Sequence, residues 1–177
     1  MFSSTFNRLR SSRFAALCVS LLLLSCAWTN GYAQENTAVD DMLREAQTQM
    51  SKGRPREAES ILRKAISAAP DRADLYFLRS RARDSSGKFD AALEDATRYI
   101  ELEPDDYYGY LNRARIYLSI DKTDSALKDA NKAIEVAPNE SDAYYGRADI
   151  YSYMGRDAQA RADEAKAEEL DRQAQAR

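Results

Sequence analysis

Hydrophobic and small residues recur along this chain with a fixed period of 34 residues, from Val39 to the C-terminus. Three prolines mark the period, namely Pro70, Pro104 and Pro138. Aligning the units on these prolines also superposes Gly53, Gly87, Asp121 and Gly155. A fixed period of this length indicates stacked supersecondary units. Each unit holds two amphipathic runs with a Gly or Asp between them and a Pro after the second, so each predicts a helical hairpin.

The pattern predicts two helices in each unit: residues 37–52 and a partner beginning at Pro55, then 72–86 and 89–102, 106–120 and 123–136, 140–154 and 157–175. The polar residue after each Pro is suited to the N-terminus of the next helix; these residues are Asp71, Asp105 and Asn139. The last helix is rich in Ala, Glu, Lys and Arg and has few large apolar residues. A helix of this composition can cover the end of a repeat array.

Small residues occupy fixed positions when the units are numbered 1 to 34 from Val39, Ala73, Tyr107 and Ser141. Position 8 holds Ala46, Ser80, Ala114 and Ala148. Position 20 holds Ala58, Ala92, Ala126 and Ala160, and position 27 holds Ala65, Tyr99, Ala133 and Ala167. Small side chains let two helices approach closely, and position 4 supplies the bulk beside them with Met42, Tyr76, Tyr110 and Tyr144. With Pro at position 32, this pattern resembles the tetratricopeptide repeat over residues 39 to about 174.

The resemblance implies an all-α fold, an α-solenoid of four stacked helix-turn-helix hairpins. The hairpins would cover residues 39–72, 73–106, 107–140 and 141–174, with the polar capping helix continuing to residue 177. Three residues depart from the family pattern: Tyr99 at the small position 27, Arg83 at the aromatic position 11, and Arg172 where a fourth Pro would stand.

Opposite charges recur at two positions that face each other within a hairpin. Position 7 holds Arg79, Arg113 and Arg147, and position 23 holds Asp95, Asp129 and Asp163. In the first unit both positions change together, to Glu45 and Ile61. We therefore expect three partly buried, hydrogen-bonded Arg–Asp pairs with a structural role. An anion site is disfavoured because each Arg has a matched acid.

The resemblance implies that the first helices line a concave surface through positions 2, 5, 9, 12 and 13. These positions include apolar and aromatic residues that a purely exposed helix would not keep, which indicates a partner site. The candidate partner-binding residues are Leu43, Phe77, Arg81, Tyr108, Leu111, Arg115, Leu118, Tyr145 and Tyr153. Arg81 and Arg115 share position 9 and would grip acidic groups of a peptide. Alternatively these charges are satisfied internally, by an Arg115–Asp149 pair and an Arg81–Asp84 pair.

The first 33 residues have the layout of a secretory signal peptide. They contain three arginines and no acid, followed by an apolar run from Phe14 to Leu24, which is too short to span a membrane. Small residues before Gln34 fit a signal-peptidase cut after Ala33. A competing cut lies before Cys26, because residues 23–26 resemble the lipobox of bacterial lipoproteins, although Leu24 is unusual there. The sequence favours soluble export to the periplasm or medium over a membrane-anchored lipoprotein lipidated at Cys26.

The chemistry of the chain argues against an enzyme. Histidine is absent, and a cut after Ala33 would also remove both cysteines, Cys18 and Cys26. The commonest general base, the usual zinc ligands and a thiol nucleophile would then be missing, so no metal or cofactor is expected. The exported chain would carry 23 of the 26 basic residues and all 29 acidic ones, which does not favour nucleic acid as a partner. The sequence therefore predicts a non-enzymatic module that binds a peptide or protein, with a lipid-anchored structural subunit of a bacterial envelope assembly as the alternative.

Overall fold

The computed structural model describes residues 37–176, and the chain divides into two units at Asp41 and Met42. Of the first unit only residues 37–41 are described, and they are helical. The predicted signal peptide and the lipidation site at Cys26 lie outside the described residues. Everything below concerns the second unit, which contains the repeats.

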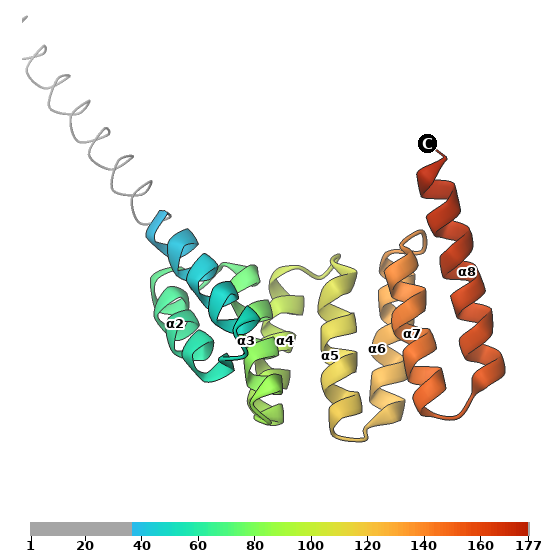
Figure 1. The fold of residues 1–177 in the computed structure, drawn as a ribbon, viewed down its shortest axis with the longest axis horizontal. Coiled ribbons are helices and arrows are strands. Elements are labelled where there is room, and N and C mark those ends of the chain that lie inside the picture. Colours follow the sequence, from blue (N-terminus) through green and yellow to red (C-terminus); the bar gives the residue numbers. More distant parts are fainter. Residues whose placement is uncertain (1–36, 177) are drawn as a thin grey trace, which may run out of the picture. The chain divides into compact units, whose positions relative to one another are not determined.

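The second unit is built from antiparallel helical hairpins (Figure 1). The helix that ends at residue 51 is followed by α2 (Pro55–Ala68), α3 (Ala73–Ser85), α4 (Phe89–Leu102), α5 (Tyr107–Ser119), α6 (Thr123–Val136), α7 (Ser141–Tyr153) and α8 (Asp157–Gln175). From α2 onward each helix packs against the next, and the first helices α3, α5 and α7 also contact one another in sequence order. The predicted all-α solenoid of stacked hairpins is confirmed, and residues 37–176 contain no strand.

Glycine and proline end the helices as the pattern predicts. Gly53, Gly87 and Gly155 have φ near +70°, and Asp121 adopts φ 58° at the same position of the third hairpin. After Asp121, the N–H of Lys122 bonds back to the carbonyl of Tyr117, which closes the left-handed cap. Helices α2, α4 and α6 span 14 residues each and end before a Pro, whereas α8, with Arg172 in place of that Pro, continues for 19 residues. A missing stop signal therefore lengthens the last helix.

The predicted role of the residues after each Pro is wrong. The N-cap positions of α3, α5 and α7 are Arg72, Asp106 and Glu140, one residue later than Asp71, Asp105 and Asn139. Of these three N-caps, Asp106 alone accepts a capping bond, from the N–H of Tyr108 at 2.9 Å. The turn after each Pro takes one more residue than the pattern suggests, because the chain must reverse fully before the next helix begins.

The alanines form the inner packing surface. All ten alanines at positions 8, 20 and 27 are at most 3% exposed. The tyrosines at position 4 add a hydrogen bond to the preceding connection: the hydroxyls of Tyr76, Tyr110 and Tyr144 donate to the carbonyls of Pro70, Pro104 and Pro138 at 2.9, 3.1 and 3.1 Å. The Pro that ends one hairpin is thereby tied to the first helix of the following one.

Two positions that lack the usual alanine, Tyr99 and Ser80, each have a compensating partner in the following hairpin. Tyr99 occupies a small position, and Gly109 faces it: a Cβ on Gly109 would lie 2.6 Å from the Tyr99 ring. Ser80 replaces an alanine at position 8, and its buried hydroxyl accepts a hydrogen bond from the side-chain amide of Asn112 at 2.5 Å. The substitutions are therefore matched pairs, each made across the contact between two repeats.

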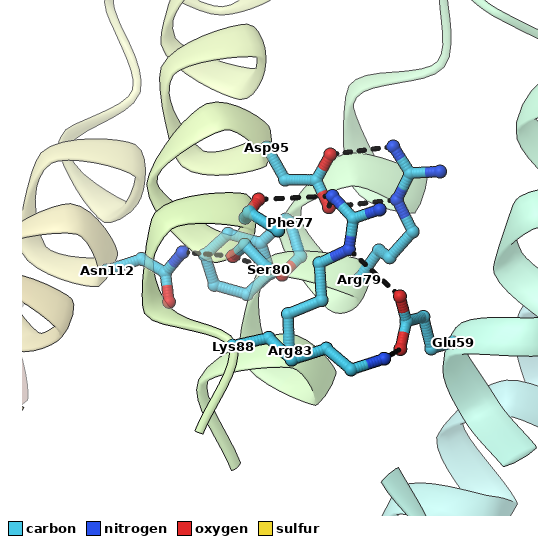
Figure 2. Close-up of polar contacts among 9 residues, drawn as sticks. Glu59, Phe77, Arg79, Ser80, Arg83, Lys88, Asp95 and Asn112 are labelled. Atoms are coloured by element: carbon cyan, nitrogen blue, oxygen red, sulfur yellow. Dashed lines mark hydrogen bonds and ion pairs between the residues drawn. The ribbon is translucent and has the colours of Figure 1, made fainter. Parts of the chain in front are cut away.

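Arg83, at the usual aromatic position 11, joins a buried charge network (Figure 2). Its Nε donates to Glu59 on α2 at 3.2 Å, and its Nη1 lies 2.9 Å from Asp95 on α4. Lys88 donates to the other oxygen of Glu59 at 2.7 Å. Glu59 is only 5% exposed, so these cations offset the cost of burying its charge. The first hairpin thus docks on the second through charged groups where an aromatic ring would otherwise pack.

Candidate protein-interaction groove

The three Arg–Asp pairs expected from positions 7 and 23 are present, and they hold the hairpins rather than a ligand. Each guanidinium makes two bonds to one carboxylate: Arg79 to Asp95 at 2.8 and 2.7 Å, Arg113 to Asp129 at 2.8 and 3.0 Å, and Arg147 to Asp163 at 2.7 and 2.7 Å. The three carboxylates are almost fully buried. Bidentate pairing of this kind fixes the angle between two helices.

Two of these arginines also reach the preceding hairpin. Arg113 donates its remaining nitrogen to Thr97 at 3.1 Å, and Arg147 donates to Asn131 at 2.9 Å. The hydrogen bonds to Asp129 raise the pKa of Arg113 above its usual value, so this group stays charged throughout the accessible pH range. In both arginines all three side-chain nitrogens bond to groups of the scaffold, which argues against an anion site there.

A groove of about 350 Å³ lies across α3, α5 and α7. It is lined by Phe77, Arg81, Tyr108, Leu111, Asn112, Ala114, Arg115, Leu118, Gly146, Asp149 and Ile150. Six of the nine residues proposed from the sequence are in this set. The other three are not: Leu43 is half-buried on the first helix, Tyr145 donates to Asp171 at 3.3 Å, and Tyr153 is 59% exposed outside the groove.

Sequence reasoning missed the residues that shape the groove floor. Gly146 stands at position 6 of the last hairpin, and a Cβ there would lie 2.7 Å from Leu111 Cδ2. Leu111 therefore packs directly on the backbone of α7, which brings α5 and α7 close together. The signal was the Gly at an otherwise variable position, because an isolated Gly within a helix usually reports a close approach.

The charged residues of the groove are paired differently from the expectation. Arg115 donates to the buried carboxylate of Asp84 on α3 and to the side-chain carbonyl of Asn112 at 3.3 Å, so the expected pair with Asp149 does not form. Nor does Arg81 pair with Asp84. Its guanidinium lies 5.9 Å from the centre of the Phe77 ring, one turn toward the helix N-terminus. Side chains on a helix lean in that direction, which carries Arg81 away from an acid three residues later.

Tyrosines close the groove at its edge. The rings of Tyr107 and Tyr108 stack at 4.2 Å, and the Tyr108 hydroxyl donates to Asp142 on α7 at 2.9 Å. Burial, followed by the neighbouring Tyr108 hydroxyl and Asp142, raises the pKa of Tyr107, so its hydroxyl stays protonated at neutral pH. Tyr108 is still 46% exposed, which leaves its ring face available to a partner.

Models of the tetratricopeptide repeat match residues 43–107, 79–134 and 130–162, which together cover more than half of the chain. The chain belongs to the tetratricopeptide repeat family. Proteins of this family generally mediate protein–protein interactions. No curated protein matches the whole chain significantly.

Solved structures share the fold of this tetratricopeptide repeat protein. A crystal structure of MamA is 24% identical and superposes with a TM-score of 0.66, over 78% of this chain and 81% of the MamA chain. The thermophilic protein TTC0263 from Thermus thermophilus is 20% identical with a TM-score of 0.68, over 75% and 74% of the two chains. A mutant O-GlcNAc transferase of Thermobaculum terrenum is 17% identical with a TM-score of 0.62, and its match covers 67% of this chain but only 23% of the transferase.

The described residues contain neither a candidate metal site nor a candidate membrane-spanning helix. Within residues 37–176, no cluster of three or more His, Cys, Asp or Glu side chains is arranged to hold a metal ion. In the same range, no helix combines the length and the apolar character required to cross a membrane.

Proposed function

We propose that this tetratricopeptide repeat protein is a non-enzymatic interaction module that binds a peptide or protein segment in the groove across α3, α5 and α7. The observation that carries the proposal is the gathering of Phe77, Tyr108, Leu111 and Leu118 in one groove that also holds exposed charges. Apolar side chains provide affinity through burial, and polar groups at the rim orient the ligand.

Two exposed tyrosines provide a matched test of the groove. Tyr108 lines it, whereas Tyr153 lies outside it, and each donates its hydroxyl to a nearby aspartate. We would compare Tyr108→Ala with Tyr153→Ala in pull-downs from a native envelope extract, after circular dichroism shows equal helix content. A protein captured by wild type and by Tyr153→Ala but lost on Tyr108→Ala would support the groove. Equal capture by all three proteins would refute it.

We further propose that the protein acts outside the cytoplasm, after removal of residues 1–33. The support is the arginine-rich, acid-free start followed by an apolar run. The alternative is a lipid-anchored subunit of an envelope assembly, attached through Cys26. Mass spectrometry of the N-terminus of the protein from its native host separates them: a start at Gln34 supports soluble export, an acylated start at Cys26 supports the anchored form, and an intact Met1 refutes both.

A further inference from the structure

The three charged residues at position 9 line the same groove but differ in what they contact. Arg81 on α3 is exposed, and among residues 37–176 it has no carboxylate within ion-pair distance. Asp149 on α7 is likewise exposed, and within that range no cation pairs with it. Arg115 lies on α5, between the helices that carry the other two.

Arg115 belongs largely to the scaffold. Its Nη1 is bonded to Asp84, whose side chain is 6% exposed, and its Nη2 is bonded to Asn112. Asn112 in turn donates to Ser80, so a chain of polar contacts joins α3 and α5 beneath the groove. Asp84 sits in the last turn of α3, where a negative charge opposes the helix dipole and requires a cation. The charge of Arg115 is therefore offset within the protein.

The groove is consequently polarised. It offers a cation on α3 and a carboxylate on α7 that have no ion-pair partner among residues 37–176, with the side chains of Tyr108, Leu111 and Leu118 between them on α5. An anionic ligand would satisfy only one end, and a cationic ligand only the other. A partner with both charges, separated by apolar residues, complements the whole groove.

We infer that the occupant is an extended peptide in which one acidic and one basic residue flank an apolar stretch, with the acid on Arg81 and the base on Asp149. This inference rests on the proposed function of the groove. Neighbouring packed helices lie about 8–10 Å apart, so α3 and α7, on either side of α5, are separated by roughly 16–20 Å. An extended chain covers that distance in about five or six residues.

The charges also favour one direction for a peptide of given sequence. Turning that peptide round would place its base against Arg81 and its acid against Asp149, which replaces two attractions with two repulsions. Exposed pairs of this kind are individually weak, so a given peptide should prefer one direction over the other by about tenfold in affinity. Burial of the apolar stretch supplies the remaining affinity in either direction.

The test is a selection of random peptides by display on the purified whole protein, followed by affinity measurements on the enriched peptides. The informative variants are Arg81→Glu, which makes both ends of the groove acidic, and Asp149→Lys, which makes both ends basic. Their controls are Arg161→Glu and Glu164→Lys, which make the same charge changes at two exposed positions of α8 outside the groove. Tyr108→Ala reports whether the selected peptides occupy the groove at all.

The expected result for wild type is an acid and a base about five or six residues apart around apolar residues, in either order along the peptide. Arg81→Glu should select two bases and Asp149→Lys two acids at that spacing, and the two α8 controls should select the wild-type pattern. Peptides without a charge bias, or with the wild-type pattern on both groove variants, would overturn the inference while leaving the groove function standing. So would a spacing of about eleven to thirteen residues, which would indicate a helical ligand. If no peptide is enriched, or if binding is insensitive to Tyr108→Ala, the proposed function itself fails and the inference falls with it.

Discussion

Gly109 faces Tyr99 across the contact between the third and second hairpins, and this pair allows a quantitative test of how the repeats are matched. A Cβ at Gly109 would lie 2.6 Å from Cδ1 and 2.9 Å from Cε1 of the Tyr99 ring. The ring cannot easily move aside. Its hydroxyl donates to Asp106, the N-cap of α5, and its face lies 5.2 Å from the Phe77 ring centre.

Two opposing effects determine how much Gly109→Ala changes the free energy of unfolding. Overpacking against a fixed ring costs about 1–3 kcal/mol, whereas Ala is favoured over Gly inside a helix by about 1 kcal/mol. The free energy of unfolding should therefore fall by up to about 2 kcal/mol in the wild-type background. In a Tyr99→Ala background the ring is gone, so the same change should raise it by up to about 1 kcal/mol.

The assay is a double-mutant cycle by urea unfolding, followed by far-ultraviolet circular dichroism. Tyr99→Ala alone should be the least stable protein, because it empties a buried site and removes the hydroxyl bond to Asp106. A stabilising osmolyte, used at one concentration for all four proteins, keeps that variant measurable. The reasoning is refuted if Gly109→Ala changes the free energy of unfolding by the same amount and in the same direction in both backgrounds, since the two residues would then be energetically independent.

Three further predictions concern the charges, a tyrosine hydroxyl and a helix end. Burial raises the pKa of Glu59, but hydrogen bonds from Lys88 and Arg83 more than offset this effect, so the pKa of Glu59 in the folded protein is lowered below 4.5. The ionised Glu59 therefore stabilises the fold above pH 4.5, and this contribution is lost as the pH falls through the pKa of the folded protein. In a plot of the free energy of unfolding against pH, Glu59→Gln should show a smaller loss of stability on the acid side than wild type. Tyr110→Phe should lower the free energy of unfolding by about 0.5–1.5 kcal/mol and the more exposed Tyr144→Phe by less, as measured in urea; equal losses would contradict this. Asp121→Val should lower the free energy of unfolding by about 1–2 kcal/mol, because φ at this residue is 58° and a β-branched side chain is strained there. Asp121→Gly should cause no such loss, and thermal melts of the two variants would measure the difference.

Local periodicity explains why so much of the fold follows from the sequence. The positions of Gly53, Gly87 and Gly155 require a left-handed backbone and end a helix wherever it packs. The alanines are buried because they recur on one helical face, and the Arg–Asp pairs recur because each joins two helices of one hairpin. Such relations need only the helix pitch and one short turn, and the four hairpins repeat them.

The contacts between hairpins, in contrast, were determined only by the tertiary structure. Arg115 could have bonded to an acid on either neighbouring helix, and it bonds to Asp84 on the earlier one, because that buried carboxylate needs a cation. That choice leaves Arg81 and Asp149 without partners among the described residues and gives the groove its polarity. The sequence predicted six of the residues that line the groove. Their pairing depends on rotamers and on the offset between stacked helices, which a repeat pattern does not encode.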